Sequence, residues 1–134
     1  MTPTFALVIF ALVTMTALTI EIVYGYVTQG FGYGFSSNRP IIEKTALGLR
    51  IQRAYQNQVE SAAYIVPVLA GAALAGLEAP GVLVACAVIV LGRAAFVLLY
   101  YTGVPFIRIL GFTCGSLGTL YVAIQLIATL GAAA

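Results

Sequence analysis

Apolar residues fill four long stretches of the chain, and short segments rich in glycine and proline separate them. As helices, these stretches are long enough to cross a bilayer hydrocarbon core of about 30 Å. The pattern therefore predicts an all-α protein whose single domain, residues 1–134, is a bundle of four transmembrane helices. We place the four spans at residues 4–29, 45–77, 82–102 and 106–130.

The second predicted helix begins with a polar stripe and continues into an apolar run. Five polar side chains recur there at intervals of three and four residues, which places them on one face of a helix. They are Arg50, Arg53, Asn57, Glu60 and Tyr64. A polar face that enters a bilayer requires polar partners, so we expect other helices to bring such groups toward it.

Composition supports the membrane assignment. Hydrophobic residues make up 62% of the chain and charged residues 7%, whereas soluble domains carry about 25% charged residues. The net charge of +2 is too small to indicate a nucleic-acid partner. The chain has no histidine, and histidine is the usual general base and the commonest metal ligand. We therefore expect no metal site.

The few charges inside the other spans fall in the same half of the bilayer as the polar stripe. Glu21 lies in the last third of the first span, Arg93 lies about 12 Å from the end of the third, and Arg108 begins the fourth. Basic residues gather around the first and third loops, so the positive-inside rule places these loops in the cytoplasm and both termini outside.

Two interpretations of these charges remain open. Burying an arginine near mid-bilayer costs about 2.5–3.5 kcal/mol, which an internal salt-bridge network with Glu21 and Glu60 would offset. Alternatively, Arg53, Arg93 and Arg108 outnumber the two acids and attract an anionic ligand. For Glu21 we expect pairing with an arginine of a neighbouring helix, with a catalytic role as the alternative.

Residues 30–40 alternate glycines with aromatic residues before a turn, and we expect a non-helical stretch. A connecting loop at the membrane interface is the simpler interpretation, and a lid over a site is the alternative. In the fourth span, Gly111, Gly115 and Gly118 predict close helix packing.

Two motifs resemble those of one family. Arg53-Ala-Tyr-Gln-Asn57-Gln-Val-Glu60 resembles the R-A-x-x-N-x-x-E signature of the membrane-associated proteins in eicosanoid and glutathione metabolism (MAPEG). The third and fourth spans are similar to the family's pattern at Leu91-Gly-Arg93, Tyr100, Gly103-Val-Pro105 and Arg108. The resemblance covers nearly the whole chain, and Asn38-Arg39 before the second helix is similar to the bacterial members.

The resemblance implies a homotrimer in a bacterial inner membrane, with sites between subunits near the cytoplasmic side and glutathione as co-substrate. It implies that Arg108 stabilises the glutathione thiolate. It also implies a set of glutathione-binding residues, which comprises Arg50, Arg53, Asn57, Glu60, Arg93, Tyr100 and Thr113.

Three departures from the family pattern bear on activity. Phe96 stands where members often have tyrosine or histidine. Ile109 replaces the serine of at least one prostaglandin-synthesising member, which argues against prostaglandin isomerisation. The basic residue that several members carry at the end of the first helix is missing, and Arg39 is a candidate replacement.

Three functions follow from these observations. The first is a glutathione transferase or peroxidase that acts on lipophilic electrophiles or lipid hydroperoxides. The second is a non-catalytic member that binds membrane lipid or serves as a scaffold. The third is a small multidrug transporter, which four short spans and Glu21 suggest, although such a transporter does not need Arg93 or the polar stripe.

Overall fold

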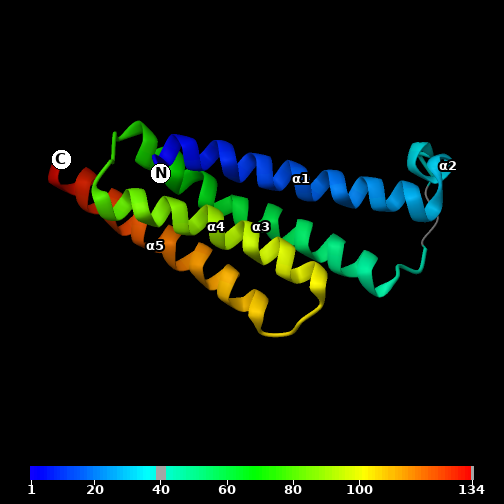
Figure 1. Cartoon of the computed structure of the whole chain (residues 1–134). Helices are drawn as coiled ribbons and strands as arrows, with labels where there is room; N and C mark the ends of the chain where they lie inside the picture. The colour runs from blue at the N-terminus through cyan, green and yellow to red at the C-terminus, as the bar shows by residue number, and fades with distance from the viewer. Residues whose placement is uncertain (39–41, 134) are drawn as a thin grey trace.

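The computed structural model describes residues 1–38 and 42–133. Four long helices lie alongside one another: α1 (Pro3–Gln29), α3 (Ala46–Leu74), α4 (Pro80–Thr102) and α5 (Ile107–Ala133). A short fifth helix, α2 (Phe31–Phe35), follows α1 (Figure 1). The expectation that residues 30–40 are non-helical was therefore wrong for α2, while Arg39 lies outside the described residues.

Local sequence signals fix the helix ends. Thr45 caps α3 by accepting a hydrogen bond from the Gly48 N–H at 3.0 Å. Pro80 begins α4. Proline is tolerated there because the first N–H groups of a helix have no acceptor within the helix, so no hydrogen bond is lost. Gly103 ends α4 with a φ of 76°, a conformation that glycine adopts without strain. α3 continues through Pro67 as one helix.

The helices α3 and α4 form the centre of the bundle. Both contact α1 on one flank and α5 on the other, and within the described residues α1 and α5 do not touch each other. The core consists of buried apolar side chains from all four long helices, including Phe10, Ile65, Leu69, Ile89 and Val122.

The seam between α4 and α5 is the closest of the helix contacts. A Cβ added at Gly111 would lie 2.7 Å from the Gly92 carbonyl oxygen and 2.8 Å from the Phe96 amide nitrogen. A Cβ added at Gly115 would lie 2.7 Å from a side-chain carbon of Arg93, and one added at Gly118 would lie 2.8 Å from a side-chain carbon of Ile89. The predicted glycine packing is confirmed, with α4 as the partner.

Within residues 1–38 and 42–133, three helices are long and apolar enough to cross a membrane: α1, α4 and α5. Their outward faces carry many exposed large hydrophobic side chains, as lipid contact requires. α3 does not reach the same hydropathy over the described residues because the polar stripe occupies its first half. The protein is an all-helical integral membrane protein, and the fourth crossing, through α3, stays a prediction.

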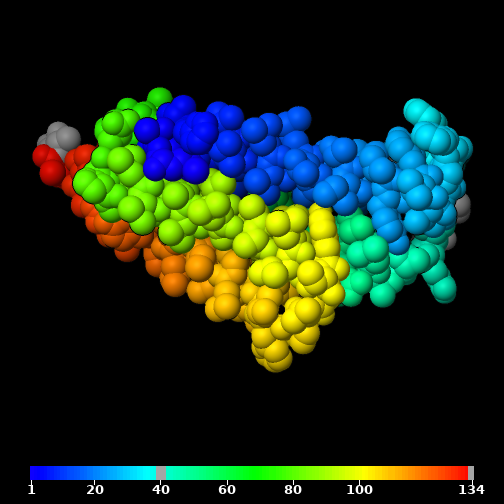
Figure 2. Space-filling view, viewed as in Figure 1, coloured from blue at the N-terminus to red at the C-terminus, as the bar shows by residue number. Residues whose placement is uncertain are grey.

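The two ends of the bundle differ. Both termini and the α3–α4 turn lie at one end, and α2 and the α4–α5 turn lie toward the other (Figure 1). The α4–α5 turn forms a lobe that projects to the side of the bundle, separate from α2 (Figure 2). Arg50 near the start of α3 and Arg108 in the first turn of α5 lie toward this second end.

Candidate functional site

Among the described residues, Arg93 is the largest fully buried side chain, with no exposed surface. Its Nε donates to Oε1 of Gln58 at 3.0 Å. Its Nη2 donates to the Asn57 carbonyl at 3.1 Å and to the Asn57 side-chain oxygen at 3.0 Å. Nη1 is also buried and has no hydrogen-bond partner among the described residues. The guanidinium is thus held by neutral amides through two of its nitrogens, and the third nitrogen is unpaired in the part of the chain that the structure describes.

Gln58 connects Arg93 to the first helix, because its Nε2 donates to Thr14 Oγ1 of α1 at 3.3 Å. Gln58 was not among the site residues predicted from the sequence. A signal was present: Gln58 lies on the core face of α3, in a stripe whose other members are Ile51, Ala54, Ser61, Ile65, Leu69 and Ala72. A long amide in an otherwise apolar or small stripe indicates a buried polar partner.

Aromatic rings link Arg93 to Arg108. The Arg93 guanidinium carbon lies 4.8 Å from the ring centre of Phe96, which meets the Tyr100 ring edge-on at 5.3 Å. The half-buried Arg108 lies over the Tyr100 ring at 4.2 Å. A cation over an aromatic face is stabilised by about 0.5–2 kcal/mol. Tyr100 therefore fixes the position of Arg108.

Arg50 reaches the same end of α4. The guanidinium of Arg50 lies against Gly103 at the α4–α5 turn, in the space that a Cβ at this position would occupy. Nε of Arg50 is buried without a hydrogen-bond partner in the described structure. Arg50, Arg93 and Arg108 therefore all lie against the last three turns of α4.

Three predicted site residues do not contact this cluster within the described chain. Arg53, Glu60 and Thr113 are exposed on the protomer surface. The Glu60 carboxylate accepts a hydrogen bond from Gln56 at 3.1 Å and lines an open groove of about 430 Å³ between α1 and α3, together with Glu21.

The expected ion pair between Glu21 and an arginine does not form within the described residues. Neither does an internal salt-bridge network, since amides hold Arg93 and an aromatic ring holds Arg108. Glu21 and Glu60 instead line the α1–α3 groove, whereas Arg93 and Arg108 contact Phe96 and Tyr100 of α4. The arginine cluster keeps an uncompensated positive charge at the edge of a membrane-embedded helix pair.

This arrangement suits an anion. Spare guanidinium donors in a low-dielectric setting interact far more strongly with an anion than they would in water. Fold and site thus define the class: a helical integral membrane protein with a cationic site at one end of the bundle. A model of the MAPEG family matches residues 3–128, and the chain belongs to that family. No curated protein and no solved structure shows significant similarity to it.

Proposed function

We propose that the protein is a membrane-bound glutathione transferase or peroxidase that uses an arginine-stabilised thiolate. The observation that carries the proposal is the uncompensated arginine cluster, in which Arg93 has an unused buried donor and Arg108 is positioned by Tyr100. The family concerns eicosanoid and glutathione metabolism, which makes glutathione the natural anionic ligand.

Arg108 is the proposed thiolate partner. A free thiol has a pKa near 8.5, so little of it is thiolate at neutral pH. Lowering that pKa to about 6.5 requires about 2.7 kcal/mol of preferential stabilisation of the anion. One half-buried guanidinium is sufficient for this, because its charge is poorly screened beside Tyr100. No histidine base is needed.

The remaining residues would bind the ligand. Arg50, which is only partly buried, would contact the ligand at the α4–α5 turn. Arg93 is fully buried, so it would act through its charge and by holding Asn57 in place. In transfer, the thiolate sulfur forms a bond to the electrophile, and a leaving group departs or a proton is taken up. In peroxidation, two glutathione molecules are oxidised to the disulfide, and the hydroperoxide is reduced to an alcohol and water. The lipophilic substrate would arrive from the bilayer.

A homotrimer with four-helix protomers belongs to the same proposal. Arg53, Glu60 and Thr113 are exposed in the protomer, which is what a site completed by a neighbouring subunit requires. We place α2 and the α4–α5 turn in the cytoplasm and the termini on the outer side of a bacterial inner membrane, because the basic residues gather at the α2 end.

The test is the ultraviolet difference spectrum of the purified protein on addition of glutathione. We expect a thiolate band in the wild type and its loss in Arg108→Ala. The control is Ile109→Ala, which removes an exposed side chain from the same turn of α5 and should keep the band.

A band of equal size in Arg108→Ala would contradict the role of Arg108. No band in the wild type would overturn the thiolate mechanism and favour the non-catalytic lipid-binding alternative. The family assignment argues against the small multidrug transporter.

A further inference from the structure

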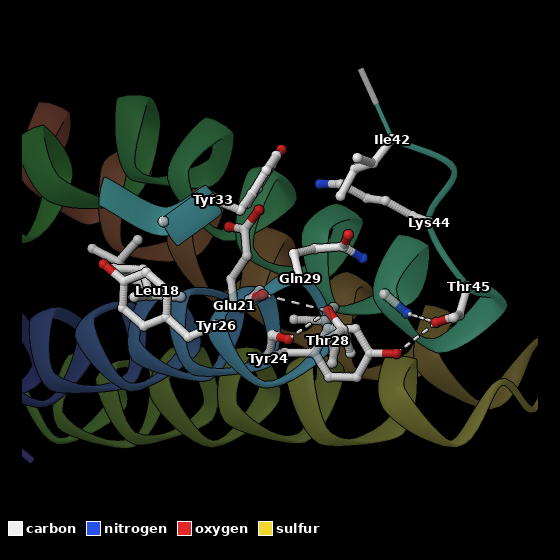
Figure 3. A pocket seen from close by; sticks show the side chains of 15 residues that line it. Leu18, Glu21, Tyr24, Tyr26, Thr28, Gln29, Tyr33, Ile42, Lys44 and Thr45 are labelled. Atoms are coloured by element: carbon white, nitrogen blue, oxygen red, sulfur yellow. Dashed lines mark hydrogen bonds between the residues drawn. The ribbon is translucent and has the colours of Figure 1, made fainter. Parts of the chain in front are cut away.

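A cavity of about 390 Å³ lies between α1, α2 and the start of α3, apart from the arginine cluster (Figure 3). None of the residues assigned to glutathione lines it. One part of its wall is apolar and includes Leu18, Ile22 and Ile51. The remainder is polar and contains both a carboxylate and an ammonium group.

The two charges of the cavity do not neutralise each other. Glu21 extends from α1, and Lys44 extends from the segment before α3 into the same space (Figure 3). The described structure contains no ion pair between them. A half-buried carboxylate beside apolar side chains favours a cation that donates hydrogen bonds, and the ammonium of Lys44 favours an anion. The cavity therefore suits a ligand that carries both charges.

A hydroxyl pair adds a donor beside Lys44. The Tyr24 hydroxyl and Thr45 Oγ1 are 2.5 Å apart, and Thr45 Oγ1 also accepts the Gly48 N–H. Only one of the two hydroxyl hydrogens is used between the pair. The other is free to donate, and both side chains line the cavity. An anionic group would thus meet an ammonium and a hydroxyl donor together.

The cavity lies at the level of the membrane surface. Ala17 packs against Phe96 and Tyr100 near the end of α4, and α1 continues for about three turns beyond that point. Phe31 and Phe35 of α2 stack on Tyr26 and are themselves 69% and 78% exposed. Exposed aromatic rings at this depth are typical of the lipid–water interface. Lipid headgroups are therefore the molecules closest to the cavity.

We propose that this cavity binds the headgroup of a zwitterionic phospholipid with a primary ammonium, of the phosphatidylethanolamine type. The ammonium donates to Glu21, and the phosphate accepts from Lys44 and from the Tyr24–Thr45 pair. A primary ammonium fits better than a quaternary one because the Glu21 carboxylate needs N–H donors, which choline lacks. The acyl chains extend along the apolar face of α1, where Val23 and Val27 are exposed. α2 forms one wall of this site.

The experiment measures lipid retained by the full-length protein from bilayers that contain equal amounts of phosphatidylethanolamine and phosphatidylglycerol. Purified protein is released into detergent, and its bound lipids are counted by native mass spectrometry. The wild type should enrich phosphatidylethanolamine about tenfold over the bulk ratio, the factor that one charge-assisted hydrogen bond provides. Glu21→Gln should abolish this preference, and Lys44→Gln should reduce retention of both lipids.

The matched control is Glu78→Gln, which makes the same change in the exposed α3–α4 turn at the other end of the bundle and should retain the enrichment. Bulk-ratio retention in the wild type, or unchanged enrichment in both cavity variants, would overturn the proposal. Retention of free phosphoethanolamine at the same level as the intact lipid would also overturn the proposal, because it would indicate a soluble ligand. Displacement of the lipid by glutathione would overturn it as well. The proposal is independent of thiolate formation, which the difference spectrum tests separately.

Discussion

The buried Arg93 shows how a charged residue is accommodated here without a counter-charge. Its guanidinium is held by the side chain and carbonyl of Asn57 and by Gln58, and Gly115 leaves space for its aliphatic carbons. Neutral acceptors pair Nε and Nη2, but they leave Nη1 without a partner among the described residues and leave the charge in place. A carboxylate partner would have cancelled the positive potential that an anionic ligand requires.

Replacing Gln58 by leucine tests this arrangement at similar side-chain volume. The variant would leave Nε of Arg93 without an acceptor inside the protein and Thr14 without its α3 contact. A buried donor that loses its partner costs about 1–3 kcal/mol, so we expect a clearly lower melting temperature in detergent. The measurement is thermal unfolding followed by circular dichroism.

Gln56→Leu is the control, because Gln56 is exposed on the same helix and bonds only to Glu60. Equal melting temperatures for the two variants would mean that Gln58 does not support Arg93.

At the scale of the helices, the sequence predicted the four long elements to within a few residues. The apolar lengths and the cap residues Thr45, Pro80 and Gly103 define them locally. The short helix α2 was missed because its glycines, Gly32 and Gly34, have poor helix propensity. Its stacking contacts with Tyr26 come from a neighbouring helix and are not visible in its own sequence.

The same limit applies to the candidate site. Periodicity placed the polar stripe on one helix face, but it could not show that Arg93 points at the amides of Asn57 and Gln58 rather than at Glu60. Which of these groups Arg93 contacts depends on how α3 and α4 are aligned along their axes. The Arg50 contact at Gly103 depends likewise on how the α4–α5 turn folds toward α3.

The α4–α5 seam gives a prediction about packing. Gly111→Ala would place a methyl group against backbone atoms of Gly92 and Phe96, which cannot move aside as a side chain would. Overpacking of this kind costs about 1–3 kcal/mol. We expect a lower melting temperature and a weaker thiolate band, since Arg93 and Arg108 come from the two separated helices.

Gly131→Ala serves as the matched control, because nothing lies within 4 Å of a Cβ at that position of α5. Its stability should be unchanged or slightly higher, since alanine favours a helix. An equal loss of stability in both variants would point to helix propensity instead of the seam.

At the scale of the whole molecule, the protomer leaves a surface that suits assembly. The acidic Glu60 is exposed along the α1–α3 groove, and the exposed Arg53 lies on the same helix as Glu60. We expect a detergent-solubilised particle with three times the protomer mass. The charge reversal Arg53→Glu should shift it toward the monomer through like-charge repulsion, as measured by native mass spectrometry.

Glu78→Lys is the control, because it reverses a charge in the α3–α4 turn at the far end of the bundle. The trimer should persist in that variant. A monomeric wild type would contradict the assembly, and the site residues on the protomer surface would then need another explanation.

The glycine seam also determines how the protein responds to the bilayer around it. At Gly111, α5 lies directly against backbone atoms of α4. Lateral pressure from the membrane cannot bring the two helices closer there, because no side chain can change its rotamer to make room. α1 meets its neighbours through side chains such as Phe10 and borders the cavity next to α2. Changes in lateral pressure should therefore be absorbed by α1 and by the volume of that cavity. The spacing between Arg93 and Arg108 would stay constant as lipid composition varies.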